Sequence, residues 1–287
     1  MASSGLLPAR TEMGAVTLWV ANLDLMVTYY RDGVGLDLIA QETNRAILGY
    51  KGRGVIILEA KFQMRQASPQ EAGLFHTAIL FDSQSALAQA VQSVAQKYPG
   101  TFTGSADHLV SEAFYFNDPE GNGVELYWDR DRTQWSWAHG SISMDTTYLD
   151  PNQYLKMHLR EEDVSSSKKV GHVHLSVGSV EAAEEFYVTM LGFEKTLNWG
   201  GQALFVSAGK YHHHMAMNTW RSKGAGRRQL ALGLGNVEIH LENEDQLGET
   251  RERLDFHQQR VIFADGEVRV EDPWGNLIRI RSVEVKD

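Results

Sequence analysis

The stretch "GHVHLSVGSVEAAEEFYVTMLGFEK", residues 171–195, decides the fold, because the chain contains it in two versions. Residues 14–38, "GAVTLWVANLDLMVTYYRDGVGLDL", align with it without gaps at an offset of 157 (171 − 14). The same residue recurs at three equivalent places: Gly14 and Gly171, Tyr30 and Tyr187, Gly35 and Gly192. Each version begins with alternating apolar residues, typical of a strand, and continues into an amphipathic helix that ends at a glycine turn.

A second repeated stretch supplies the end of the same unit. Residues 117–128, "NDPEGNGVELYW", resemble residues 271–282, "EDPWGNLIRIRS". In both, glycine and asparagine permit a tight turn before a last strand. The chain therefore divides into four modules of strand, helix and three strands, at roughly 13–66, 73–130, 168–222 and 229–285. We expect modules one and two within residues 1–130, a connector at 131–167, and modules three and four within 168–287.

Composition limits the class of protein. The chain has 287 residues, 43% of them hydrophobic, and a formal net charge of −10. The acidic balance argues against a nucleic-acid partner, which needs a basic face. The absence of cysteine excludes disulfides, thiolate metal sites and cysteine nucleophiles. Neither a signal-like N-terminus nor an apolar run of about 18 residues occurs, so we expect a cytoplasmic protein with no membrane partner.

The fourfold module resembles the vicinal oxygen chelate superfamily, which includes glyoxalase I, bleomycin-resistance proteins and type I extradiol dioxygenases. The resemblance implies an α+β fold in which pairs of βαβββ modules form two half-barrel cups. It also implies that first and last strands supply the ligands of a divalent metal. By the repeat register, these positions include His76, Glu125 and His172. Two histidines and one carboxylate form the facial triad of non-haem Fe(II) oxygenases, which leaves metal positions open.

The pairing of the modules decides whether these three residues meet. If module two pairs with module three, one cup holds all three, and modules one and four form a metal-free cup with Glu59 and Arg279 at ligand positions. If module one pairs with module two instead, Glu59 joins His76 and Glu125, and His172 is left over. We favour the first pairing because it uses every ligand-type residue.

Residues 107–125, "DHLVSEAFYFNDPEGNGVE", have the spacing H-x(5)-F-Y-x(2)-D-P-x-G-x(3)-E. From the histidine onward this resembles the extradiol ring-cleavage dioxygenase signature, and Ala106 departs from it at the first position. The resemblance implies that Glu125 is the carboxylate ligand. It further implies that Tyr115 hydrogen-bonds a catecholate oxygen and that His108 lies beside the same oxygen as a donor.

The run "YHHHMAM", residues 211–217, carries three adjacent histidines. In the extradiol family a histidine at the start of this strand acts as an acid–base group beside dioxygen, and the family spacing selects His213, three residues before Ala216. Strand alternation favours His212 and His214 instead, because they share parity with Ala216, unless the strand starts or bulges here. His213 is our first choice, the other two stay alternatives, and none of the three is expected to bind the metal.

The resemblance implies an extradiol ring-cleaving dioxygenase of aromatic hydrocarbon catabolism. Its cofactor would be Fe(II), with Mn(II) as the alternative metal, and its substrates a small aromatic diol and O2. His174 shares a strand face with His172, so we expect it to orient a ligand by a hydrogen bond. Two other functions stay open: a glyoxalase-like isomerase or thiol transferase, and a non-catalytic small-molecule-binding resistance protein. Assembly into a homo-oligomer is left open too.

Overall fold

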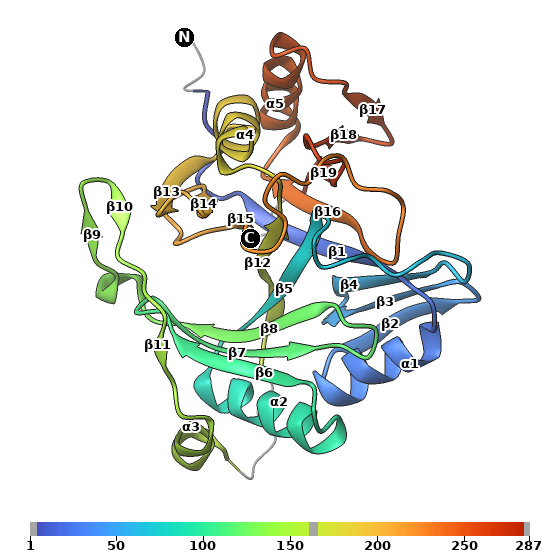
Figure 1. Ribbon diagram of the computed structural model, residues 1–287, viewed down its shortest axis with the longest axis vertical. Helices are drawn as coiled ribbons and strands as arrows, with labels where there is room; N and C mark the ends of the chain where they lie inside the picture. Colours follow the sequence, from blue (N-terminus) through green and yellow to red (C-terminus); the bar gives the residue numbers. More distant parts are fainter. Residues whose placement is uncertain (1–4, 161–165, 284–287) are drawn as a thin grey trace. The chain divides into compact units, whose positions relative to one another are not determined.

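The computed structural model describes residues 5–160 and 166–283. The chain divides into two compact units, each of which holds two modules (Figure 1). The first unit consists of Thr17–Met64 and His76–Gly171, and the second consists of Met1–Val16, Arg65–Phe75 and His172–Asp287. Three strands pass from one unit into the other along the chain: β1 (Glu12–Val20), β5 (Gly73–Phe81) and β12 (Lys168–Ser176).

The first unit contains modules one and two, each with the expected order of strand, helix and three strands. Module one continues from β1 through α1 (Leu23–Thr28), a π-helical turn (Tyr29–Gly33), β2 (Asp37–Glu42), β3 (Arg45–Tyr50) and β4 (Arg53–Ala60). Module two continues from β5 through α2 (Gln84–Lys97), β6 (Phe102–Asp107), β7 (Ser111–Asn117) and β8 (Gly123–Asp129). In module two, β5 pairs with β8 in parallel, and β8, β7 and β6 pair antiparallel. The helix α2 covers one face of this sheet (Figure 1).

The segment after β8 belongs to the first unit. It forms a 3-10 turn (Arg132–Gln134), β9 (Trp137–Ala138), β10 (Ser141–Ile142), β11 (Thr147–Tyr148) and α3 (Pro151–His158). The strand β11 pairs with β6, and α3 packs against α2. The described part of the expected connector is therefore an extension of module two rather than an open linker. Residues 161–165 of the expected connector lie outside the described residues, and β12 begins at Lys168, directly after the connector.

The second unit contains modules three and four. Module three continues from β12 through α4 (Val180–Glu184), a π-helical turn (Glu185–Met190), β13 (Glu194–Trp199), β14 (Ala203–Ser207) and β15 (Met215–Asn218). Module four comprises β16 (Gly233–Leu241), α5 (Glu244–Phe256), β17 (Ile262–Ala264), β18 (Glu267–Glu271) and β19 (Leu277–Ser282). First and last strands again pair in parallel, β12 with β15 and β16 with β19.

Local sequence explains where each module's helix begins. A serine or asparagine precedes every one of these helices, and its side chain accepts a hydrogen bond from the backbone N–H three residues later. The four residues are Asn22, Ser83, Ser179 and Asn243. Such a cap satisfies a backbone donor that the first turn leaves without an intrahelical partner, and is worth about 1 kcal/mol.

The repeated tyrosine and the repeated Asp-Pro turn meet inside each unit. The Tyr30 hydroxyl donates to Asp118 Oδ2 at 3.0 Å, and the Tyr187 hydroxyl donates to Asp272 Oδ2 at 3.0 Å. All four side chains are buried. Burial raises the pKa of the Asp118 carboxyl to about 6, although hydrogen bonds from Asn122 and Tyr30 work in the opposite direction. The sequence repeat therefore marks a buried bond that ties the helix of one module to the last turn of the next.

The repeated glycines Gly14 and Gly171 allow close approach of neighbouring side chains. A Cβ at Gly14 would collide with His240 and Glu238, and one at Gly171 would collide with the hydroxyl of Tyr127. Glycine is therefore the residue that fits at the same place in both copies of the repeat.

The predicted fold class is confirmed: the chain has an α+β fold built from βαβββ modules with curled sheets. The division into residues 1–130, 131–167 and 168–287 stays a prediction, as does the pairing of modules two and three around a metal. None of the helices in the described residues is long and apolar enough to cross a membrane.

Candidate active site

Module two brings a buried histidine and a buried carboxylate together. His76 lies on β5 and Glu125 on β8, and these two strands are parallel neighbours. The His76 Nε2 and Glu125 Oε2 atoms are 2.9 Å apart, and the two side chains are 8% and 3% exposed. Burying a carboxylate is costly unless a partner or a metal compensates it, so this pair is more than a surface contact. It places an imidazole nitrogen and a carboxylate oxygen where one cation could bind both.

Tyr115 lies beside this pair on β7. In the antiparallel register of β7 and β8, Tyr115 is directly opposite Glu125. Its ring centroid is 5.7 Å from that of His76. Burial, and next the charge of Glu125, raise the pKa of the Tyr115 hydroxyl well above its usual value. Tyr115 therefore keeps its proton and acts as a hydrogen-bonding hydroxyl rather than as a phenolate.

His108 extends this arrangement by one residue. Its Nε2 lies 2.6 Å from the Tyr115 hydroxyl, and its Nδ1 lies 2.8 Å from the backbone carbonyl of Asp145. A carbonyl oxygen only accepts, so Nδ1 carries a proton. A neutral His108 can then accept a hydrogen bond from the Tyr115 hydroxyl at Nε2, in competition with the Glu125 carboxylate, which also hydrogen-bonds this hydroxyl. The donor role that we expected for His108 therefore requires the doubly protonated ring.

The segment that follows β8 supports the His108–Tyr115 bond through the backbone carbonyl of Asp145. Sequence reasoning missed this contribution. Asp145 belongs to the segment that we expected to be a connector, and it contributes its main-chain carbonyl rather than its side chain. The pairing of β11 with β6, Thr147 opposite Asp107, anchors this part of the chain beside His108. A backbone acceptor has no signature in a sequence, because every residue has one.

The second unit holds a separate group of histidines. His172 lies on β12 and is buried. The ring centroid of His213 is 4.1 Å from that of His172, and the ring centroid of His212 is 6.0 Å from it. The three adjacent histidines precede β15, which begins at Met215. The alternation of side chains along a strand therefore does not apply to these histidines. The strand starts after them, so the alternation argument for His212 and His214 no longer opposes the family spacing, which selects His213.

The three adjacent histidines have different environments. The Nδ1 atoms of His212 and His213 are 2.8 Å apart. His214 instead accepts a hydrogen bond at Nδ1 from the backbone N–H of Ala208, at 3.2 Å, and lies near the rings of Tyr211 and Phe193. Of His212 and His213, the structure brings His213 nearer to His172.

His174 follows His172 on β12 and has a polar partner on β15. Its Nε2 lies 3.0 Å from Asn218 Nδ2. The rings of Phe75 and Trp220 lie beside it, with centroids 5.0 and 5.4 Å away. The amide group therefore donates to His174, and this bond fixes the ring plane of a buried histidine. The expected hydrogen bond from His174 to a metal ligand stays a prediction.

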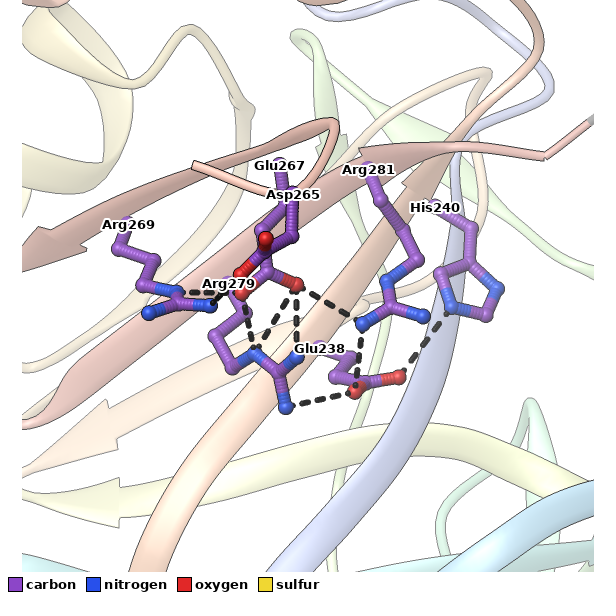
Figure 2. Close-up of polar contacts among 7 residues, drawn as sticks. All are labelled: Glu238, His240, Asp265, Glu267, Arg269, Arg279 and Arg281. Carbon is purple, nitrogen blue, oxygen red and sulfur yellow. Dashed lines mark hydrogen bonds and ion pairs between the residues drawn. The ribbon is translucent and has the colours of Figure 1, made fainter. Parts of the chain in front are cut away.

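Module four has an ionic network where module two has His76 and Glu125. Figure 2 shows acidic and basic side chains from β16, β18 and β19 that point toward one another. Arg279 Nη1 is 3.2 Å from Glu238 Oε1, and Arg279 Nη2 is 2.7 Å from Glu267 Oε2. Arg281 Nη2 is 2.8 Å from the same Glu267 oxygen, and Arg269 binds the other one. Arginine at these positions disfavours a cation, so this face of module four does not offer a metal site.

Glu267 is the centre of this network. Burial alone would raise the pKa of its carboxyl, but hydrogen bonds from Arg279, Arg269 and Arg281 outweigh that effect and lower the pKa to about 2. Glu59, which we expected opposite Arg279, belongs to the first unit. It accepts a hydrogen bond from Trp19 Nε1 at 3.2 Å. The expected pairing of Glu59 with Arg279 stays a prediction.

The sequence matches one protein superfamily and is similar to a protein of known name. Residues 12–126 and 169–280 match the Glyoxalase/Bleomycin resistance protein/Dioxygenase superfamily. The chain is 31% identical to a catechol-2,3-dioxygenase of Bacillus subtilis (strain 168) over 270 residues, which cover 92% of this chain and 94% of the relative.

Two solved structures share the fold. One is a Bacillus subtilis (subsp. subtilis, strain 168) protein solved as a candidate dioxygenase, with a TM-score of 0.68, 13% identity, and coverage of 94% of this chain and 84% of the other. The second is glyoxalase I from Zea mays, with a TM-score of 0.59, 15% identity, and coverage of 94% and 92%. At these identities the likeness extends to the fold and no further.

Proposed function

The chain belongs to the Glyoxalase/Bleomycin resistance protein/Dioxygenase superfamily, and on that premise we propose that it is an extradiol ring-cleaving dioxygenase of catechol-type substrates. The observation that carries the proposal is the hydrogen bond of 2.6 Å between His108 and Tyr115, beside the buried pair of His76 and Glu125. The superfamily and the catechol-2,3-dioxygenase of Bacillus subtilis, to which the chain is similar, point to an enzyme. That this chain itself cleaves the ring of a catechol is our proposal.

We further propose that His76, Glu125 and His172 bind Fe(II), with Mn(II) as the alternative metal. The chemistry of this donor set fits: each residue offers one ligand atom, each is buried, and none is a thiolate. Two neutral imidazoles and one carboxylate favour Fe(II) or Mn(II) and leave coordination positions open. Fe(II) bound there would supply open coordination positions for the diol and for dioxygen, together with the redox chemistry that joins them.

Tyr115 and His108 would receive the diol. The raised pKa of the Tyr115 hydroxyl disfavours a phenolate. The diol hydroxyl would therefore pass its proton to the Tyr115 oxygen while Tyr115 passes its own proton to His108 Nε2, so that Tyr115 is a hydroxyl before and after the step. The Asp145 carbonyl, bonded to His108 Nδ1, stabilises the imidazolium that results. The pair thus lets the diol bind as an anion without releasing a proton to water.

His213 would act on the other substrate. Its Nδ1 is committed to His212, so proton donation must use Nε2. A neutral imidazole that hydrogen-bonds developing negative charge on dioxygen and then donates its proton contributes typically 10²–10⁴-fold in rate. Two observations disfavour the alternative functions. The reaction of an isomerase or thiol transferase of the same fold does not need the hydrogen-bonded His108–Tyr115 pair. A non-catalytic binder does not need a set of metal ligands.

The test is a turnover assay on the full chain loaded anaerobically with Fe(II), then exposed to O2 and a panel of catechols. We expect O2 uptake in step with the yellow ring-opened product. Parallel samples loaded with Mn(II), Ni(II) or Zn(II) are offered the hemithioacetal of methylglyoxal. Isomerisation of that compound without any O2 uptake would replace our proposal by the glyoxalase-like one. The cytoplasmic location, the role in aromatic hydrocarbon catabolism and any homo-oligomer are part of the proposal, not of the findings.

A further inference from the structure

His212 and His213 share a hydrogen bond that joins the same atom of two adjacent rings. The two Nδ1 atoms are 2.8 Å apart. A neutral imidazole carries its proton on one nitrogen only, so one ring of this pair must donate at Nδ1 and the other must accept there. The bond therefore links the tautomers of the two histidines: fixing one fixes the other.

His212 has a buried ring with a close aromatic neighbour and a hydrogen-bonded backbone carbonyl. It is fully buried, at 0% exposure. It lies against the ring of Tyr211, with centroids 4.0 Å apart, and its backbone carbonyl accepts a hydrogen bond from Thr196 Oγ1 at 2.7 Å. His213, in contrast, packs on the ring of His172. His212 is thus a fully buried group that contacts His213 through its Nδ1 atom.

The direction of the bond follows from the task of His213. A proton donor that uses Nε2 must carry its proton there, so its Nδ1 must be the acceptor. The donor in the bond is then Nδ1–H of His212. We propose that His212 is a positioning residue that holds His213 in the Nε2–H tautomer. This inference rests on the proposed function, because it takes its direction from proton donation by His213.

The kinetic test compares two substitutions at one position. His212→Asn keeps a side-chain amide that can donate from about the place of Nδ1, whereas His212→Leu fills the space without a donor. We expect His212→Leu to lower kcat roughly 10- to 100-fold, the usual range for removing a residue that orients a functional group. KM for the diol should stay unchanged, since the binding residues are in module two. His212→Asn should recover most of the lost rate.

The control makes the same change elsewhere in the unit. His257→Asn, at the C-terminal end of α5, removes a half-buried histidine that has no part in the bond. It should match the wild type in both kcat and KM. Equal rates for His212→Asn and His212→Leu, in proteins that unfold at the same temperature, would overturn the positioning role. A change of KM alone would overturn it as well.

A second readout needs no turnover. Long-range ¹H–¹⁵N spectra of the full chain, metal-free and with ¹⁵N-labelled histidine, distinguish Nδ1–H from Nε2–H rings, and the His212 and His213 signals are assigned by the variants. We expect Nδ1–H at His212 and Nε2–H at His213. The reverse pattern would overturn the inference even in an active enzyme. If no catechol is cleaved by the iron-loaded wild type, the proposed function fails, and these spectra still decide the direction of the bond.

Discussion

Tyr115 differs from the other buried tyrosines in what its hydroxyl contacts. Tyr30 and Tyr187 donate to carboxylates of structural turns, whereas the Tyr115 hydroxyl contacts His108 as well as the Glu125 carboxylate. Tyr115→Phe keeps the ring and removes both contacts. We expect the variant to retain iron and to lose roughly 10²–10⁴-fold in ring cleavage, the range for a lost acid–base group. Steady-state O2 uptake measures the loss.

The matched control is Tyr148→Phe, which makes the same change on β11 at a side chain that is 80% exposed. It should leave the rate of O2 uptake unchanged. Equal rates in the two variants would mean that the His108–Tyr115 bond is structural, and would remove the observation on which the proposed reaction depends.

His213 and His214 are neighbours with different expected roles. His213→Phe should keep iron and diol binding and slow ring cleavage roughly 10²–10⁴-fold. His214→Phe leaves the buried N–H of Ala208 without its acceptor, so it should cost about 1–3 kcal/mol of stability. Urea titration and single-turnover kinetics on both variants separate the two effects. A slow His214→Phe beside a fast His213→Phe would show that the assignment is off by one residue.

At the scale of elements, β16, β18 and β19 are joined by Glu267 and its arginines (Figure 2). In the unfolded chain this carboxyl titrates near its ordinary value of 4.5, and in the folded protein the pKa is about 2. Between these two pH values the unfolded state binds a proton that the folded state does not. The contribution of Glu267 is therefore complete above pH 4.5 and is lost as the pH falls toward about 2.

The size of this contribution follows from the pKa difference, at 1.36 kcal/mol per unit, and is on the order of 3 kcal/mol. Glu267→Gln should lower the free energy of unfolding at pH 7 and flatten its dependence on pH below about 4.5. Glu252→Gln, on the exposed side of α5, is the control and should do neither. A Glu267→Gln protein with the acid sensitivity of the wild type would contradict the network's role.

The helices and strands were largely predictable, because the internal sequence repeat shows the same strand–helix pattern in two copies. Strand alternation and the Asp-Pro turn are local signals, and the structure has a strand and a hydrogen-bonded turn where they occur in the sequence. The His212–His213 bond was not predictable. Parity treats the three adjacent histidines as strand residues, whereas β15 begins only at Met215. The Asp145 carbonyl was not predictable either, because its side chain takes no part.

At the scale of the whole molecule, the proposed ligand set draws on both units. His76 and Glu125 belong to the first unit and His172 to the second. The family resemblance implied that first and last strands supply the ligands, and the repeat register placed these three residues at those positions, because equivalent positions of four modules can be compared within one chain. Which modules share a metal cannot be read from that register, since each pairing uses the same residue positions.

The metal content of variants at the proposed ligands tests which modules share the metal. His76→Ala and His172→Ala should each abolish iron retention, because a cation that loses one of three protein ligands loses much of its affinity. Asn236→Ala, at the equivalent first-strand position of module four, should retain a full equivalent of iron. Full iron in His172→Ala would favour the alternative set of His76, Glu125 and Glu59. Elemental analysis of the purified variants gives the answer independently of activity.

The measurement that tests the central proposal most directly is the mass of the product formed under ¹⁸O2. An extradiol dioxygenase inserts both atoms of one dioxygen molecule into the ring that it opens. We expect the iron-loaded chain to convert a catechol into a semialdehyde that carries two ¹⁸O atoms before exchange with water. A product with no label, or the absence of any diol- and iron-dependent O2 uptake, would contradict the proposal.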